Sequence, residues 1–318
     1  MKYIFLILFL AVTAKGFAQK TEIPIPPNCR YLYGNIFIDE IEIANINWLE
    51  FLHGLKKDST LEAYAKNIPD TTVHTKEFVI SNSTEIPYIE NYLRYPGFRF
   101  HPVGGITYEQ AVNFSKWRSS IVTKKIYREM VKNERKNSSL PDSIWYFNFR
   151  LPTEEEWEYA ASGGSDLDSL PYGVDDLYEE LVIKRAKFNY CSTDSSMTFK
   201  EFKKLHKLYK DRTMAPRFVA IVPPKKGFPE IYYSGIIEEY IPDRTDWIYE
   251  FSENGFGLYN MIGNVSEMVE EKGISKGGNY LLPISDCKIR DRQYYEEPHS
   301  WVGFRNICEV YKIPNPYK

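Results

Sequence analysis

One segment carries both a start and a stop signal for a helix, and it constrains the fold more than any other stretch. The segment is PTEEEWEYAASGG at 152–164. Pro152 fits at or just before a first turn, and the Thr153 side chain can cap free backbone N–H groups. Three glutamates then favour the positive end of the helix dipole, and two glycines end the helix. A short helix is predicted, with a packing face made of Trp157, Ala160 and Ala161.

Two other stretches, 35–55 and 101–120, each predict a strand that leads into a helix. In the first, Asn45 is the expected N-cap. In the second, Thr107 and Gln110 have the spacing of a capping box. The apolar positions behind these predictions are Ile36, Ile38, Ile41 and Ile43 for the first strand, Trp48, Phe51 and Leu52 for its helix, and Ala111, Phe114 and Trp117 for the second helix.

Two regions interrupt this pattern. Residues 121–147 contain a charged insertion that we expect to be helical, and motif character is lost from about 195 to 246. Within the latter, KEFKKLHKLYKDR at 200–212 has helical spacing and six Lys or Arg residues. It can be a surface helix with a solvated basic face or a docking surface for an acidic partner. No repeat or Ser/Gly linker is present, so one domain with two insertions is predicted.

The N-terminus predicts export. A basic start, an apolar run of about ten residues and a small-residue cleavage site define a signal peptide over 1–18. The alternative is an uncleaved anchor, although the run is shorter than the roughly 20 residues of a spanning helix. A proline-rich extended lead-in follows over 19–30, and the domain itself over 31–318. We expect a periplasmic, surface or secreted protein without a transmembrane segment after cleavage.

Export permits disulfides among the four cysteines, Cys29, Cys191, Cys287 and Cys308. Three full pairings are possible, and the sequence does not choose among them. A bridge between Cys287 and Cys308 would close a loop of about 21 residues and contribute about 3 kcal/mol. Four buried free thiols are the alternative.

Composition and missing motifs exclude several functions. The net charge of −3 gives no reason to expect nucleic-acid binding. The sequence has no zinc-protease, phosphate-loop, C-x-x-C or nucleophile-elbow motif. Its histidines, which show no ligand spacing, are His53, His74, His101, His206 and His299.

Seven blocks in order give the chain a resemblance to a known family. They are NIFIDEIEIAN at 35–45, HPV at 101–103 with its helix to Trp117, FRLPTEEEWEYAA at 149–161, PYG at 171–173, GFGLYNMIGNVSEM at 255–268, SKGGNY at 275–280 and GFR at 303–305. Together they resemble the sulfatase-modifying-factor, or formylglycine-generating-enzyme-like, family. The resemblance implies an α+β fold related to C-type lectins, with long loops and a small core sheet.

The resemblance also implies a calcium site in the GLYNMIGN loop. Its ligands would be the Asn260 side chain, the Gly263 and Val265 carbonyls and the Glu267 carboxylate. Such hard oxygens suit calcium. The alternative is that Asn260 and Glu267 only hydrogen-bond the loop. A second family site would fall on Asn189 and the Tyr190 carbonyl.

The copper site of the family's oxidases is altered here. Those enzymes hold copper(I) with two cysteine thiolates, and the matching positions are Leu282 and Cys287. Soft thiolates select copper(I), and leucine cannot ligate it. Two further departures, Asn279 and Ser266, fall nearby. Copper binding is therefore not expected, and Cys287 is the residual family position. The histidine-bound iron of the related ergothioneine-type enzymes has no counterpart.

These observations predict a non-catalytic, exported, calcium-stabilised module that binds a protein or an extended peptide. The resemblance points to the branch of gliding-motility and type IX secretion proteins of Bacteroidetes, although their lipid-attachment cysteine is missing. The alternatives are a formylglycine-generating or other oxidase with an altered site, and a carbohydrate-binding protein.

Overall fold

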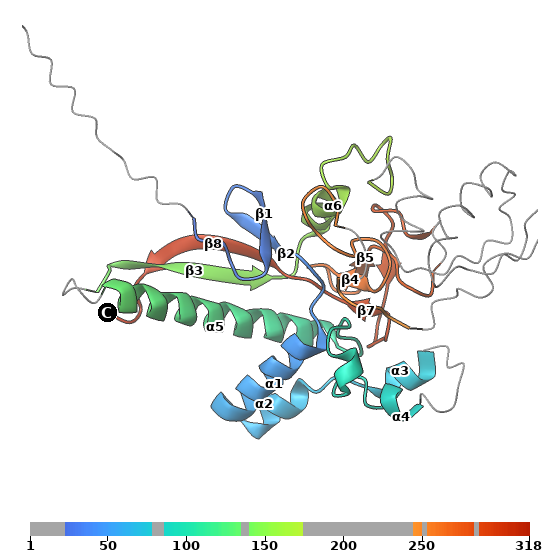
Figure 1. Cartoon of the computed structure of the whole chain (residues 1–318), viewed down its shortest axis with the longest axis horizontal. Coiled ribbons are helices and arrows are strands. Elements are labelled where there is room, and N and C mark those ends of the chain that lie inside the picture. Colours follow the sequence, from blue (N-terminus) through green and yellow to red (C-terminus); the bar gives the residue numbers. More distant parts are fainter. Residues whose placement is uncertain (1–22, 78–85, 135–139, 174–243, 250–252, 283–285) are drawn as a thin grey trace, which may run out of the picture.

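The computed structural model describes residues 23–77, 86–134, 140–173, 244–249, 253–282 and 286–318 of the chain (Figure 1). Its helices are α1 (Asn45–Asp58), α2 (Leu61–Lys66), α3 (Thr72–Glu77), α4 (Ile86–Ile89), the 3-10 helix η2 (Pro96–Phe98), α5 (Tyr108–Glu134) and α6 (Glu154–Ser162). Its strands are β1 (Cys29–Tyr33), β2 (Ile36–Asp39), β3 (Ser143–Arg150), β4 (Ser266–Met268), β5 (Ile274–Lys276), β6 (Gln293–Tyr294), β7 (Val302–Gly303) and β8 (Ile307–Pro314).

The first sheet is antiparallel and has the order β1-β2-β8-β3. Helix α5 runs along β3 (Figure 1) and accepts hydrogen bonds from N–H groups on the outer edge of this strand. The Ser119 hydroxyl accepts from the Phe149 N–H at 2.8 Å, and the Thr123 hydroxyl accepts from the Phe147 N–H at 3.1 Å. Because an open sheet edge invites pairing with other chains, these contacts protect β3.

The second sheet is small and has the order β6-β5-β4-β7. Strands β4 and β7 are parallel, and the other pairs are antiparallel. Long loops connect these short strands, and they carry the motif blocks of the C-terminal half. Helices, two small sheets and long loops together confirm the predicted α+β, loop-rich fold.

Two of the three predicted helix starts are correct. The hydroxyl of Thr107 accepts from the Gln110 N–H at 3.1 Å, and the Gln110 side chain accepts from the Thr107 N–H at 2.9 Å. Thr153 caps α6 in the same way with Glu156, and Gly163 ends that helix in the left-handed conformation.

The prediction of an N-cap at Asn45 was wrong. The N-cap is Ala44, and the Asn47 side chain accepts from its N–H at 3.1 Å. The Asn45 amide instead donates to the Phe98 carbonyl at 2.8 Å in the interior. The same carbonyl also accepts from the His101 N–H at 3.1 Å, so Asn45 is tied into a buried turn and not to the helix end.

The strand expected before the second helix was wrong, because residues 101–107 form only a single bridge, between Pro102 and Ala44. Two element boundaries also differ from the expected ones. Strand β2 ends at Asp39, so Ile41 and Ile43 lie beyond it, and the Ile43 N–H donates to the Phe304 carbonyl at 2.9 Å. Helix α5 continues without a break to Glu134, and β3 already begins at Ser143. Residues 121–134 are therefore helical as expected, but 143–147 belong to the first sheet.

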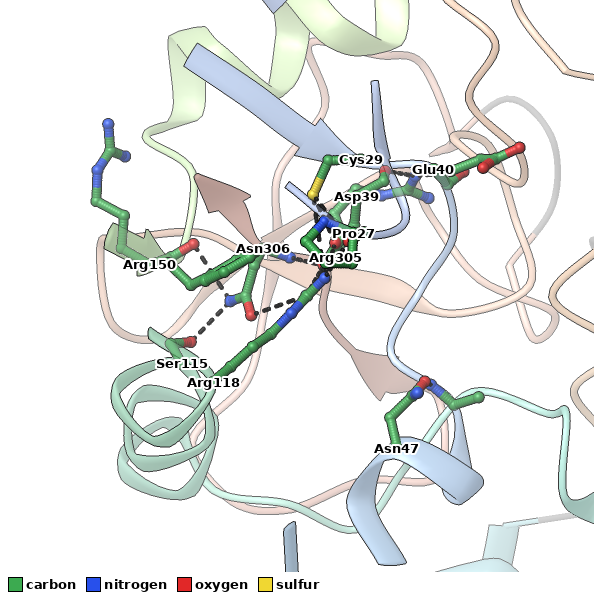
Figure 2. Close-up of polar contacts among 12 residues, drawn as sticks. Pro27, Cys29, Asp39, Glu40, Asn47, Ser115, Arg118, Arg150, Arg305 and Asn306 are labelled. Atoms are coloured by element: carbon green, nitrogen blue, oxygen red, sulfur yellow. Dashed lines mark hydrogen bonds and ion pairs between the residues drawn. The ribbon is translucent and has the colours of Figure 1, made fainter. Parts of the chain in front are cut away.

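Asn306 joins helix α5 to both neighbouring strands (Figure 2). Its amide donates to the Ser115 hydroxyl at 2.7 Å and to the Arg150 carbonyl at 3.2 Å. Its N–H donates to the Asp39 carboxylate at 2.8 Å. This buried polar junction lies beside the start of β8 and fixes the register of the first sheet against α5.

Several predictions lie outside the described residues. These are the signal peptide at 1–18, most of the region 195–246, and the positions Asn189, Tyr190 and Cys191. Among the described residues, none of the helices combines the length and the apolar character needed to cross a bilayer.

Candidate functional site

The loop between Phe256 and Glu267 is shaped by residues in the left-handed conformation. Gly257, Asn260, Gly263 and Asn264 all have φ between 52° and 78°. Glycine and asparagine are the residue types that tolerate this conformation best. The resulting turns direct three polar side chains, those of Asn260, Asn264 and Glu267, into the protein interior.

Glu42 receives two of these side chains. The Asn260 amide donates to its carboxylate at 3.0 Å, and the Asn264 amide donates to the other oxygen at 2.9 Å. Burial raises the pKa of Glu42 to about 8, whereas the nearby Arg305 lowers it and Glu267 raises it further. Sequence reasoning missed Glu42 as a site residue, although it stands in the first motif block.

Glu267 forms a second, adjoining set of contacts. Arg305 donates to both carboxylate oxygens, each at 2.6 Å, and the Trp157 indole N–H donates to one of them at 2.7 Å. Arg305 also donates to the Tyr259 carbonyl at 2.8 Å. These buried charges are paired and hydrogen-bonded, as charges in an interior must be. The sequence signal for Arg305 was its GFR block.

The donors present fit the expected calcium ion. Asn260, Gly263, Val265 and Glu267 are all buried along this one loop. The Asn260 Oδ1 atom accepts no hydrogen bond from the described residues. Glu267 accepts three hydrogen bonds of the roughly four that a carboxylate can take. No group of three or more His, Cys, Asp or Glu side chains occurs in the described part of the chain, so a cation here would need amide and carbonyl oxygens.

Cys287, the residual copper position, is buried and forms no disulfide with another described cysteine. It packs in one hydrophobic cluster with Trp157 and Ile289, and Leu282 lies against the same cluster. Burial raises the pKa of the Cys287 thiol to about 12. The thiol is therefore protonated near neutral pH, and a protonated thiol is a poor nucleophile.

Close backbone packing encloses this thiol. The α-carbon of Gly278 lies against Cys287, and a Cβ atom there would overlap the Sγ atom. The Gln293 side chain connects the two backbone segments that pack together here. It accepts from the Gly278 N–H at 3.0 Å and donates to the Asp286 carbonyl at 3.0 Å. Sequence reasoning did not single out Gln293.

The other two departures from the oxidase pattern contact each other. The Asn279 amide donates to the Ser266 hydroxyl at 3.1 Å, and both residues are buried. The Asn279 side-chain oxygen also accepts from the Leu281 N–H at 3.0 Å. The two positions at which the sequence departs from the oxidase pattern are thus joined by a hydrogen bond.

The three described cysteines form no disulfide with one another, so Cys287 and Cys308 are not bridged. Cys308 belongs to a different cluster, packed against Phe147 and Cys29. Cys29 and Cys308 do not pair either, because β2 lies between their strands. Two strand spacings place the backbones of β1 and β8 roughly 9.5 Å apart. This separation exceeds the Cα–Cα distance that a disulfide can span.

Fold and site together define a class of protein that keeps a buried Glu–Asn–Arg centre beside an enclosed cysteine. The family profile described as "Sulfatase-modifying factor enzyme 1-like domain" matches residues 11–310, and the chain therefore belongs to this family. A search of curated proteins found no match.

Solved structures show similarity at low identity. PvdO from Pseudomonas aeruginosa is 17% identical with a TM-score of 0.38, over 66% of this chain and 63% of that one. Treponema denticola variable protein 1 is 14% identical with a TM-score of 0.40, over 91% and 93%. CarF is 17% identical with a TM-score of 0.40, over 86% of each chain. The chain thus spans less than two thirds of PvdO, and these likenesses carry no information on activity.

Proposed function

We propose that this protein is a non-catalytic member of its family, exported from the cell, that binds a protein or an extended peptide. The observation that carries the proposal is the enclosure of Cys287. A copper oxidase of this type needs two thiolates that copper and substrate can reach. Here one position is Leu282, and the other is a buried thiol whose pKa is raised to about 12.

A role in gliding motility or type IX secretion is the specific form of this proposal. Support comes from the motif blocks, which keep the fold while the copper position is lost. A basic and apolar leader over residues 1–18 supports export. The fold is kept although the copper position is lost, and a binding role explains this best because the long loops present a large surface.

The direct test supplies a cysteine-containing sulfatase peptide together with copper and oxygen. Mass spectrometry then measures conversion of the peptide cysteine to the aldehyde. We expect no conversion by the natural chain, and none by a Cys287→Ser variant that serves as the matched control. Conversion that requires Cys287 would overturn the proposal in favour of an oxidase with an altered site.

Calcium is proposed as a structural ion of this module. The supporting observations are the Asn260 Oδ1 atom, which accepts no hydrogen bond from the described residues, and the remaining acceptor capacity of Glu267. A divalent cation held by Asn260, Gly263, Val265 and Glu267 would use these oxygen atoms and fix the loop.

A further inference from the structure

An uninterrupted row of aromatic rings lies on the surface beside β1 and α6. Tyr33 contacts Tyr159 with ring centroids 5.7 Å apart, and Tyr159 contacts Phe256 at 5.2 Å. Tyr33 is 40% exposed and Tyr159 44%. The three rings come from β1, α6 and the loop after residue 253, so the tertiary fold has brought them together.

A second group of aromatic rings comes from residues 247–259. Tyr249 contacts Tyr259 at 5.0 Å, and Trp247 lies two residues before Tyr249. Trp247 is 54% exposed and Tyr249 51%.

Arg30 joins the two groups. Its Nε atom would lie 3.3 Å from a Cβ atom on Gly257, the neighbour of Phe256. Its guanidinium pairs with Glu40 at 2.6 Å, and the Glu40 carbonyl accepts from the Tyr259 N–H at 2.9 Å. Arg30 therefore lies between the two groups, and we call their six rings, Tyr33, Tyr159, Trp247, Tyr249, Phe256 and Tyr259, the aromatic band.

Such a band is not an ordinary surface feature. Single exposed aromatic residues are common, but contiguous exposed apolar patches mark interaction sites. Tyrosine, tryptophan and arginine are also the residues that contribute most energy to protein interfaces. Elements β1 and α6, which carry Tyr33 and Tyr159, lie on the same side of the molecule (Figure 1).

The charges around the band favour a cationic partner. Two arginines act on the band tyrosines, Arg30 and Arg150. Both are already paired, Arg30 with Glu40 at 2.6 Å and Arg150 with Glu156 at 2.7 Å. Glu155 and Glu253 are exposed, and neither has an ion-pair partner among the residues that the structure describes. Glu155 lies one helical turn before Tyr159, on the same face of α6.

Burial is the largest cause of the pKa shifts of three band tyrosines, acidic neighbours add to it, and Arg150 and Arg30 act in the opposite direction. Partial burial raises the pKa of Tyr33, and Glu156 raises it further. Partial burial likewise raises the pKa of Tyr249, with Glu40 as an added cause, and of Tyr259, with Glu253 and Glu40 as added causes. A partner that brings positive charge would be attracted to this surface.

We infer that the aromatic band binds an extended segment of another protein that is rich in lysine or arginine. Cationic side chains can lie over the tyrosine and tryptophan rings, which attract them electrostatically. Glu155 and Glu253 then supply the countercharges, and the aliphatic parts of the bound side chains pack on the rings. A neutral glycan could donate hydroxyl hydrogen bonds to the two carboxylates but would bring no positive charge to them. The inference rests on the proposed binding function and names its partner class.

The test uses a labelled peptide in which lysine alternates with leucine, and a counterpart with glutamate at every lysine. Fluorescence anisotropy measures binding of each peptide to the full chain at low and high salt. We expect the lysine peptide alone to bind, and to bind more tightly at low salt because salt screens exposed charges. The double variant Trp247→Ala/Tyr249→Ala should weaken binding about tenfold or more.

Tyr88→Ala is the matched control. Tyr88 is 47% exposed and contacts another tyrosine, Tyr95, at 4.7 Å, but it lies on α4, away from β1 and α6 (Figure 1). We expect this variant to bind the lysine peptide normally.

Equal binding of the two peptides, or equal loss in Tyr88→Ala and in the double variant, would overturn the inference. Binding of a neutral oligosaccharide that depends on the band, in place of the lysine peptide, would overturn it too. None of these results touches the proposal that the protein is non-catalytic, because aldehyde formation from the sulfatase peptide tests that separately.

Discussion

Arg118 of α5 and Asp39 of β2 form a two-pronged ion pair in the interior (Figure 2). The two nitrogen–oxygen distances are 2.6 Å and 2.7 Å. Arg118 also donates to the Pro27 carbonyl at 3.2 Å and lies over the Phe149 ring at 4.1 Å. One side chain therefore connects the lead-in, the long helix and the first sheet.

Replacement of Arg118 by methionine should destabilise the protein strongly. The Asp39 carboxylate would stay buried without its cation, which costs about 3–5 kcal/mol. Chemical denaturation measures the loss. The double variant Arg118→Met/Asp39→Asn should recover part of it, because no isolated charge remains. A double variant no more stable than Arg118→Met alone would show that the pair is not the cause.

Stability should fall as the pH drops from about 6.5 towards 3, in part through His74. Burial lowers the pKa of His74 to about 3, while the unfolded side chain titrates near 6.5. Between these values the unfolded chain binds one more proton than the folded chain, so stability rises with pH by up to about 1.4 kcal/mol per unit. A His74→Phe variant, which keeps the ring contact with Tyr92, should have a flatter dependence in this window.

His53→Gln is the control for this prediction, because His53 is exposed. Its profile of unfolding free energy against pH should match that of the natural protein. An unchanged slope in His74→Phe would show that other groups cause the acid sensitivity.

Removal of calcium should lower the thermal stability if the proposed ion is bound. A ligand at 100 times its dissociation constant stabilises a protein by about 2.7 kcal/mol. Scanning calorimetry with calcium and with a chelator measures the difference. Asn260→Leu should abolish it. Asn254→Leu should retain it, because Asn254 bonds the Ala160 carbonyl instead of the Glu42 centre.

Two outcomes would contradict the calcium prediction. A chelator effect that persists in Asn260→Leu would place the ion elsewhere in the chain. No chelator effect in the natural protein would instead mean that Asn260 and Glu267 only hydrogen-bond the loop.

The described thiols should resist alkylation in the folded state. Cys29, Cys287 and Cys308 are buried, and burial raises the pKa of each. In a Cys191→Ser background, mass spectrometry after iodoacetamide treatment should find almost no label until denaturant is added. Rapid labelling of Cys287 would reveal an open site and would weaken the non-catalytic proposal.

Gly278→Ala should be much more damaging than Gly34→Ala. Both glycines have positive φ, 68° and 54°, so both variants carry a similar backbone strain. At Gly34 a Cβ atom meets nothing within 4 Å, whereas at Gly278 it overlaps the Cys287 side chain. Overpacking adds about 1–3 kcal/mol, which a comparison of unfolding free energies would detect. Equal losses would mean that Cys287 can move away.

Local signals predicted the fold well. The capping boxes of Thr107 and Thr153 join residues three positions apart, so the sequence alone determines them. Asn45 shows the limit, because its choice of the Phe98 carbonyl over the helix end depends on a contact 53 residues away. The end of β2 at Asp39 also depends on tertiary pairing with β8.

The site was predictable only in part. The motif blocks identified Asn260, Glu267 and Cys287, but not how they are connected. Glu42 meets Asn264 across 222 positions of sequence, and no spacing rule describes such a contact. The protonated state of Cys287 likewise follows from packing around Gly278 and Gln293, which only the folded chain contains.

The order of the first sheet has a mechanical consequence. Strands β1 and β8 both run antiparallel to β2, so they are parallel to each other. A force that pulls the lead-in before Cys29 against the end of β8 therefore acts along the strands and shears them. The hydrogen bonds that β2 forms with β1 and with β8 would bear the force together instead of opening one at a time. The bond from Arg118 to the Pro27 carbonyl would add to them. A protein tethered by its lead-in and pulled through β8 would resist unfolding in this direction more than in any that peels β1 away.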